Sequence, residues 1–185
     1  YIGVTGVQTC ALPICIIIPV WHTAANGIPL GAEINPKFVK YNLIDHGFLL
    51  NLLGIGDSTN SIVKELLVDN AADLVDKGSL TEMVAGLEII KNQQPDNVPS
   101  LYFWMREARG ALAEVDYILA KDMKILPIEV KAEVKGGMKS LYSFVEAKGI
   151  THAVRTSLEN FGRFTKGDCV IDIYPLYALR NLVGT

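Results

Sequence analysis

Residues 114–131 read EVDYILAKDMKILPIEVK, and this stretch decides which fold the chain can adopt. Two apolar runs, Val115 to Ala120 and Ile125 to Ala132, flank a short polar segment, which is typical of two antiparallel strands joined by a tight turn. The polar segment is short enough for a two-residue turn made by Asp122 and Met123. Such a turn determines the register of the whole hairpin.

In this register Asp116 lies opposite Glu129, with Cβ atoms about 4.5–5.5 Å apart. Lys131 follows Glu129 by two residues and therefore lies on the same face of its strand. Two unpaired carboxylates at this separation repel each other, which favours a divalent cation between them. The alternative is an ordinary cross-strand ion pair on a solvated face, and the spacing alone leaves both interpretations open.

Working outward from the hairpin, the apolar pattern predicts an α-β-β-β-α-β order of elements from residue 77 onward. The predicted elements are a helix over 79–91, strands over 101–105, 115–120 and 125–132, a helix over 139–147 and a strand over 152–156, followed by a strand over 169–173 and a closing helix over 176–182. Because the strands are nearly continuous apolar runs, both faces of the sheet must be covered. The sequence therefore predicts an α/β fold with a mixed sheet flanked by helices.

The chain before this region has a less regular pattern. Residues 16–37 contain several Pro and Gly residues and indicate an extended connector, residues 38–44 a strand, residues 47–53 a short helix and residues 62–75 a longer helix. We therefore expect residues 15–76 to form a connector with a small α/β lead-in, and residues 77–185 to form the main domain.

Glu82 lies on a helix stripe of small and apolar residues, shared with Ala85, Gly86 and Ile89. A carboxylate on such a stripe is predicted to approach the sheet, whereas Thr81 and Glu88 are predicted to face solvent. The alternative for Glu82 is a surface carboxylate without a function.

The composition limits the classes of protein to which the chain can belong. The 185 residues have a net charge of −3 and are 50% hydrophobic, which suits one ordinary core. Residues 1–100 carry five Lys and Arg against ten Asp and Glu, whereas residues 101–185 carry twelve against ten. This distribution excludes a protein that covers nucleic acid with a broadly basic surface, although it remains compatible with a local anion-binding site.

Residues 4–14, VTGVQTCALPI, resemble a translated sequencing adapter, and we interpret residues 1–14 as an artefact of sequence assembly. The apolar run from Ala11 to Trp21 is shorter than the roughly 20 residues that a membrane span needs, so no membrane association is expected. With Cys10 set aside, only Cys15 and Cys169 remain, which suits a reduced cytoplasmic protein. No Gly-x-x-x-x-Gly-Lys-Ser/Thr loop occurs, so ATP is not expected to bind this fragment.

Asp116, twelve intervening residues and then Glu129-Val130-Lys131, set in the predicted element order, resemble the PD-(D/E)XK nuclease-like superfamily. Seven strings extend the resemblance to a C-terminal domain of unknown function in prokaryotic AAA-type ATP-binding proteins; they are NGIPL (26–30), VKYNLID (39–45), KGSLTE (77–82), YFW (102–104), EVDY (114–117), PIEVK (127–131) and KSL (139–141). This resemblance implies an N-terminal ATPase module in the full-length protein.

The resemblance implies that Glu82, Asp116 and Glu129 hold Mg²⁺ or Mn²⁺ and that Lys131 is the catalytic lysine. Val115 stands where the superfamily name has proline, a position that does not coordinate metal. Outside this motif, Lys135 and Lys139 are candidates for phosphate contacts, the alternative being that both are solvated lysines.

Two functions therefore remain open. One is a metal-dependent phosphodiesterase that acts on nucleic acid, with DNA as the expected partner. A metal ion and an ammonium together can stabilise the charge that develops during phosphodiester hydrolysis. The other is a non-catalytic domain that binds nucleic acid or a protein partner for the ATPase, since a nuclease-like fold does not by itself imply activity.

Overall fold

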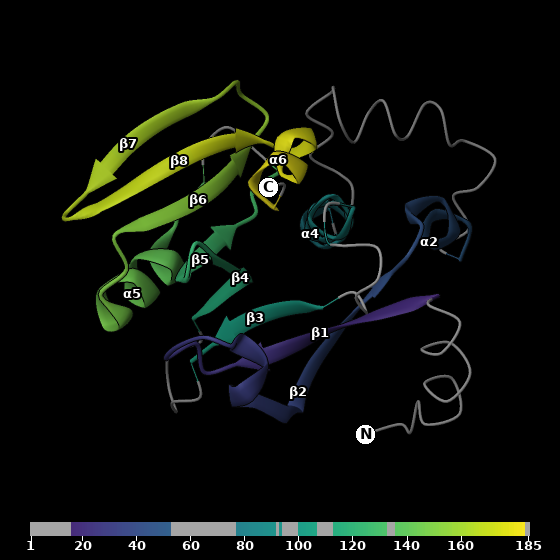
Figure 1. Ribbon diagram of the computed structural model, residues 1–185. Coiled ribbons are helices and arrows are strands. Elements are labelled where there is room, and N and C mark those ends of the chain that lie inside the picture. The colour runs from purple at the N-terminus through teal and green to yellow at the C-terminus, as the bar shows by residue number, and fades with distance from the viewer. Residues whose placement is uncertain are drawn as a thin grey trace.

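The computed structural model describes residues 16–52, 77–91, 93, 100–106, 113–132 and 136–183. The adapter-like residues 1–14, the helix expected over 62–75 and Lys135 lie outside these residues. Within them, eight strands form one mixed sheet in the order β2-β1-β3-β4-β5-β6-β8-β7 (Figure 1). The strands are β1 (Ile17–Thr23), β2 (Ile34–Leu43), β3 (Leu101–Met105), β4 (Glu114–Lys121), β5 (Lys124–Glu129), β6 (His152–Ser157), β7 (Gly162–Lys166) and β8 (Cys169–Pro175).

The helices lie on both faces of this sheet, as predicted. They are α2 (His46–Leu52), α4 (Lys77–Ile90), α5 (Lys139–Lys148) and α6 (Arg180–Val183), with short 3₁₀ turns at Leu30–Glu33 and Leu176–Ala178. Helices α4 and α6 share one hydrophobic cluster, whereas α5 packs into a second cluster on the other face of the sheet. The chain is therefore an α/β protein, and the expected order of helix, three strands, helix and strand is confirmed from α4 to β6.

The hairpin of β4 and β5 has the register that the sequence predicts. The paired residues run from Tyr117 with Ile128 to Lys121 with Lys124, and the predicted pair of Asp116 with Glu129 lies one position before the first of them. Asp122 and Met123 form the turn with φ angles of 50° and 60°, and positive φ at both positions matches the right-handed twist of the two strands. Figure 1 shows this hairpin at the middle of the sheet.

A β-bulge in β4 changes which side chains share a face. Trp104 pairs with Val115 and Tyr102 pairs with Ile118, so β4 uses one more residue than β3 between these pairs. Val115 and Ile118 consequently pack in the α5 cluster, whereas Tyr117 packs in the α4 cluster. Val115 and Tyr117, two positions apart on β4, therefore lie on opposite faces of the sheet, because the extra residue interrupts the alternation of the strand at Asp116.

The structure also corrects the N-terminal part. Residues 17–23, expected within an extended connector, form strand β1 between β2 and β3, and Ile18 and Val20 are buried in the α4 cluster. Strand β2 begins at Ile34 and the helix at His46, close to the strand and short helix expected there. Strand β7, an antiparallel neighbour of β8 at the sheet edge, was not expected. Its side chains are mostly exposed, so it has no apolar run to reveal it.

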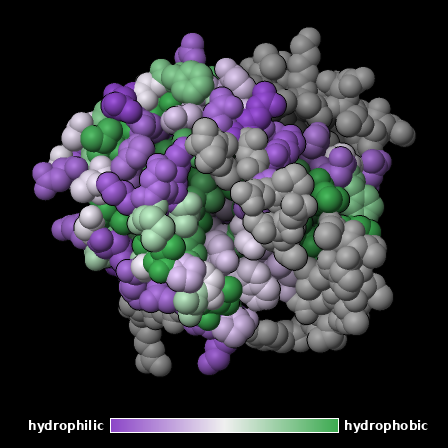
Figure 2. Space-filling view, in the orientation of Figure 1, coloured by the Kyte–Doolittle hydropathy of each residue, from purple (hydrophilic) through white to green (hydrophobic). Residues whose placement is uncertain are grey.

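On the face shown in Figure 2, the described hydrophobic residues form small patches between hydrophilic ones. Among the described residues, no helix is long and apolar enough to cross a membrane.

Candidate metal centre

Three carboxylates meet where α4 approaches the start of β4. One carboxylate oxygen each from Glu82, Glu114 and Asp116 lies within 4.8 Å of the other two. Glu82 comes from α4, whereas Glu114 and Asp116 come from β4. Oxygen ligands at this mutual separation can share one hard cation such as Mg²⁺ or Mn²⁺.

Lys40, from the edge strand β2, supplies a positive charge to this cluster. Its Nζ donates a hydrogen bond to Glu82 Oε1 at 2.8 Å and forms a second ion pair with Glu114. The ammonium also lies 4.8 Å from the centre of the Phe103 ring. Burial lowers the pKa of Lys40, but the charges of Glu82 and Glu114 outweigh this effect and raise it above its usual range.

The position of Glu82 depends on a close approach between α4 and the sheet. Tyr117 Oη donates a hydrogen bond to the Glu82 carbonyl at 2.7 Å and accepts one from Asn42 Nδ2 at 2.9 Å. A Cβ atom on Gly86 would lie 2.5 Å from the same Tyr117 oxygen, so only glycine permits this packing. The predicted approach of the Glu82 stripe is therefore confirmed. Glu88, expected to face solvent, is buried instead, with Oε1 bonded to Lys91.

Glu129 and Lys131 lie at the end of β5, beside the cluster. Lys131 Nζ is 2.7 Å from Glu129 Oε1. Glu129 is only 5% exposed, and its Oε2 has no hydrogen-bond partner among the described residues. Thr156 holds the Lys131 backbone, because its hydroxyl accepts a bond from the Lys131 N–H at 2.8 Å and donates to the Lys131 carbonyl at 3.2 Å.

The pKa values of Asp116 and Glu129 are both raised, which means that nearby positive charge does not fully compensate for burial and negative neighbours. Burial, together with the charges of Glu129 and Glu82, raises the pKa of Asp116 to about 7, although the Val130 N–H donates to its Oδ2 at 2.6 Å. Burial also raises the pKa of Glu129 and outweighs the effect of Lys131. A bound cation would relieve both effects, because it favours the ionised carboxylates.

These residues fit a divalent cation. Three carboxylate oxygens converge, and the neighbouring Glu129 has a buried Oε2 without a partner among the residues described. Of the predicted ligands, Glu82 and Asp116 belong to the converging group, and Glu129 lies outside it but interacts electrostatically with Asp116, Glu82 and Glu114. Lys139 is exposed at the start of α5, and no contact with the carboxylates brings it into the group.

Sequence reasoning missed Glu114 and Lys40 as members of this centre. Glu114 precedes Asp116 by two residues on one strand, and this spacing was a usable signal. Lys40 is 74 positions before Glu114 and belongs to no metal motif. Its role becomes visible only when β2, α4 and β4 come together.

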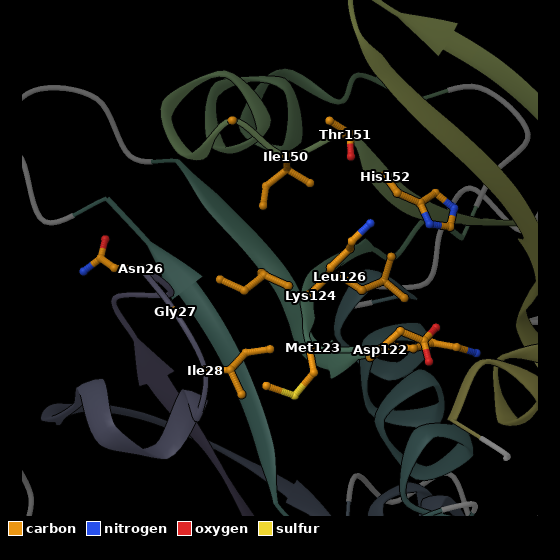
Figure 3. Close-up of a pocket in the computed structure, with 13 residues that line it drawn as sticks. Asn26, Gly27, Ile28, Asp122, Met123, Lys124, Leu126, Ile150, Thr151 and His152 are labelled. Carbon is orange, nitrogen blue, oxygen red and sulfur yellow. The ribbon is translucent and has the colours of Figure 1, made fainter.

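The structure also has an open cleft of about 820 Å³ at the other end of the hairpin. It is lined by the β4–β5 turn, the loop around Asn26 and the segment from Gly149 to His152; Figure 3 shows polar side chains such as Lys124 and His152 beside apolar ones such as Ile28 and Ile150. The converging carboxylates are not part of its lining. The cleft and the carboxylate cluster are therefore separate features of the molecule.

Comparison with known proteins assigns the region that contains this centre to a family. No curated protein and no solved structure matches the chain. The family DUF4143, described as a domain of unknown function, matches residues 77–178. The match covers more than half of the chain and includes all of the predicted site residues. The chain therefore belongs to the DUF4143 family of domains of unknown function.

Proposed function

We propose that this chain is a metal-dependent phosphodiesterase of the PD-(D/E)XK nuclease type that acts on nucleic acid, with DNA as the expected substrate. One observation carries the proposal: Glu82, Glu114 and Asp116 converge beside a buried Glu129 whose second oxygen has no hydrogen-bond partner among the described residues. The order of α4, β3, β4, β5, α5 and β6 supports the same assignment.

In this function Glu82, Glu114, Asp116 and Glu129 would hold Mg²⁺ or Mn²⁺. The ion supplies Lewis acidity, which lowers the pKa of a water molecule and polarises the phosphate. Lys131 would direct its ammonium at a phosphate oxygen and offset the negative charge that builds there. Hydrolysis forms a bond from the water oxygen to phosphorus, breaks the bond to the leaving sugar oxygen, and moves one proton from the water to that oxygen.

The proposed protein context of this domain rests on the sequence resemblance. We propose that the domain serves a cytoplasmic AAA-type ATP-binding protein and works beside its N-terminal ATPase module. Lys135 and Lys139 remain candidates for phosphate contacts in the same function. ATP itself is expected to bind the ATPase module and not this chain.

The test compares wild type with Asp116→Asn and Lys131→Ala in thermal melts with and without millimolar Mn²⁺, and in cleavage of a fluorescent DNA. Asp116→Asn is expected to remove most of the Mn²⁺-induced stabilisation and all cleavage, because it removes a ligand. Lys131→Ala is expected to keep much of the Mn²⁺ response but to lose cleavage, because an ammonium cannot ligate a cation.

Two exposed residues provide matched controls. Glu146→Gln removes a carboxylate on α5 and Lys124→Ala removes an ammonium near the hairpin turn, and neither is expected to change the Mn²⁺ response. A wild-type melt that does not respond to millimolar Mn²⁺ contradicts the proposal. Cleavage that persists in Lys131→Ala contradicts the role given to that residue.

A non-catalytic binding domain is the second candidate, and Lys40 favours it. An ammonium already bridges Glu82 and Glu114, so part of the carboxylate charge is neutralised without a metal ion. In that case DNA or a protein partner would bind with no dependence on Mn²⁺, and the same melts would separate the two candidates.

A further inference from the structure

We propose that Lys40 is the resident cation of the carboxylate cluster, and that a divalent cation enters the site only by displacing its ammonium. This inference rests on the proposed function, because it assigns Lys40 the control of metal affinity at that same site. It adds to the carboxylates and Lys131 a residue outside both the nuclease-like motif and the region matched by the family.

The geometry places Lys40 in competition with a metal ion. Its Nζ bonds to Oε1 of Glu82 and to Oε1 of Glu114, and both residues belong to the converging group. A divalent cation needs carboxylate oxygens at about 2.0–2.6 Å. The ammonium and an ion bound at that distance would both lie against the carboxylates of Glu82 and Glu114, so the two cations compete for the same residues.

Charge adds a second reason for displacement. The Lys40 side chain is only 28% exposed, so water screens it weakly from a neighbouring ion. Two positive charges about 4 Å apart repel strongly at the effective dielectric constant of such a site. The ion is therefore bound more weakly while the ammonium stays in place.

The fold gives the side chain a path out without moving the backbone. Lys40 pairs with Val20 in the ladder of β1 and β2, which holds its backbone. Strand β2 forms one edge of the sheet, and the four-carbon stem of lysine is flexible. Rotation of the side chain alone can therefore release Glu82 and Glu114 to a metal ion.

The test measures Mn²⁺ binding to the full 185-residue chain by titration calorimetry. Lys40→Met removes the charge but keeps an unbranched apolar stem against Phe103, and Lys40→Gln is a second neutral variant should the first not fold. Both are expected to bind Mn²⁺ at least about tenfold more tightly than wild type. Lys37→Met, an exposed lysine on the same strand, has the same change in net charge and is expected to alter the affinity by less than about twofold.

Thermal melts supply a second measurement. Without metal, the neutral Lys40 variants are expected to melt below wild type, because the clustered carboxylates lose their counter-ion. Added Mn²⁺ is expected to stabilise these variants by more degrees than it stabilises wild type. The Lys37→Met variant is expected to follow wild type in both conditions.

The outcomes separate this inference from the proposed function. If wild type binds Mn²⁺ through Asp116 and the neutral Lys40 variants bind it no more tightly, the role of Lys40 is overturned and the proposed function stands. If only the neutral variants bind Mn²⁺, the role of Lys40 is supported and metal-dependent activity of the natural chain is overturned. If none of these proteins binds Mn²⁺, both proposals are overturned.

Discussion

The Asp116 side chain is largely buried and lies near two other negative charges, those of Glu129 and Glu82. Its pKa is about 7 in the folded protein, against an ordinary value of 3.8, because burial and the charges of Glu129 and Glu82 disfavour ionisation. Between these two values the unfolded chain has released a proton that the folded chain still holds. Asp116 therefore costs stability progressively as the pH rises through this interval.

Asp116→Asn removes this pH dependence. We expect the stability of wild type relative to the variant to fall by roughly 1–3 kcal/mol between about pH 5 and pH 8, measured by urea unfolding in metal-free buffer. Glu146→Gln on the exposed face of α5 should show no comparable trend. A difference between wild type and Asp116→Asn that stays constant with pH would contradict the buried, charge-crowded state of Asp116.

At the scale of elements, the contact between α4 and the sheet aligns Glu82 with β4. Gly86→Ala would force the new Cβ against Tyr117 and Asn42, which join α4, β4 and β2 through their hydrogen bonds. We expect a loss of roughly 1–3 kcal/mol in urea unfolding, as in other overpacked cores, and a weaker Mn²⁺ response. Gly78→Ala on the same helix meets no atom within 4 Å and should be neutral or stabilising. Equal effects of both substitutions would contradict the close approach.

The hairpin turn gives a prediction of the opposite sign. Met123 is 84% exposed and has a φ angle of 60°, a backbone region that glycine enters more easily than methionine. Met123→Gly is therefore expected to stabilise the protein by about 0.5–1 kcal/mol in urea unfolding. Lys124→Gly, one position into β5, should destabilise it by a similar amount. If Met123→Gly also destabilises, the turn does not have the positive φ values on which the register depends.

At the scale of the whole molecule, the sheet extends beyond the region that the family match covers. Strand β1 pairs with β3, and it buries Ile18 and Val20 in the cluster that holds α4. Burial of two such side chains contributes several kcal/mol, which is a large part of the 5–15 kcal/mol that stabilises a typical domain.

A fragment of residues 77–185 is therefore expected to lose cooperative unfolding, measured by circular dichroism during heating. Removal of residues 1–14 alone is the control for truncation and is expected to leave the melting temperature unchanged within about 1 °C. If the 77–185 fragment melts cooperatively within a few degrees of the full chain, β1 and β2 are dispensable for the core.

Local patterns were sufficient for much of this structure. The two-residue turn and the apolar runs determined the β4–β5 register, because side-chain alternation and turn length act over neighbouring residues. The helical stripe on α4 and the element order up to β6 were predictable for the same reason. The candidate ligands Glu82 and Asp116 followed from these patterns, and both lie in the carboxylate cluster.

Contacts between distant segments decided the rest. The bulge at Asp116 depends on how β3 pairs with β4, and strand β1 is recognised only by its partners β2 and β3. The sequence by itself therefore determined the hairpin, the order of the central elements and two of the clustered carboxylates. The tertiary structure alone decided that Lys40 would meet Glu82 and Glu114, because 42 and 74 positions of chain separate these charges and no local periodicity relates them.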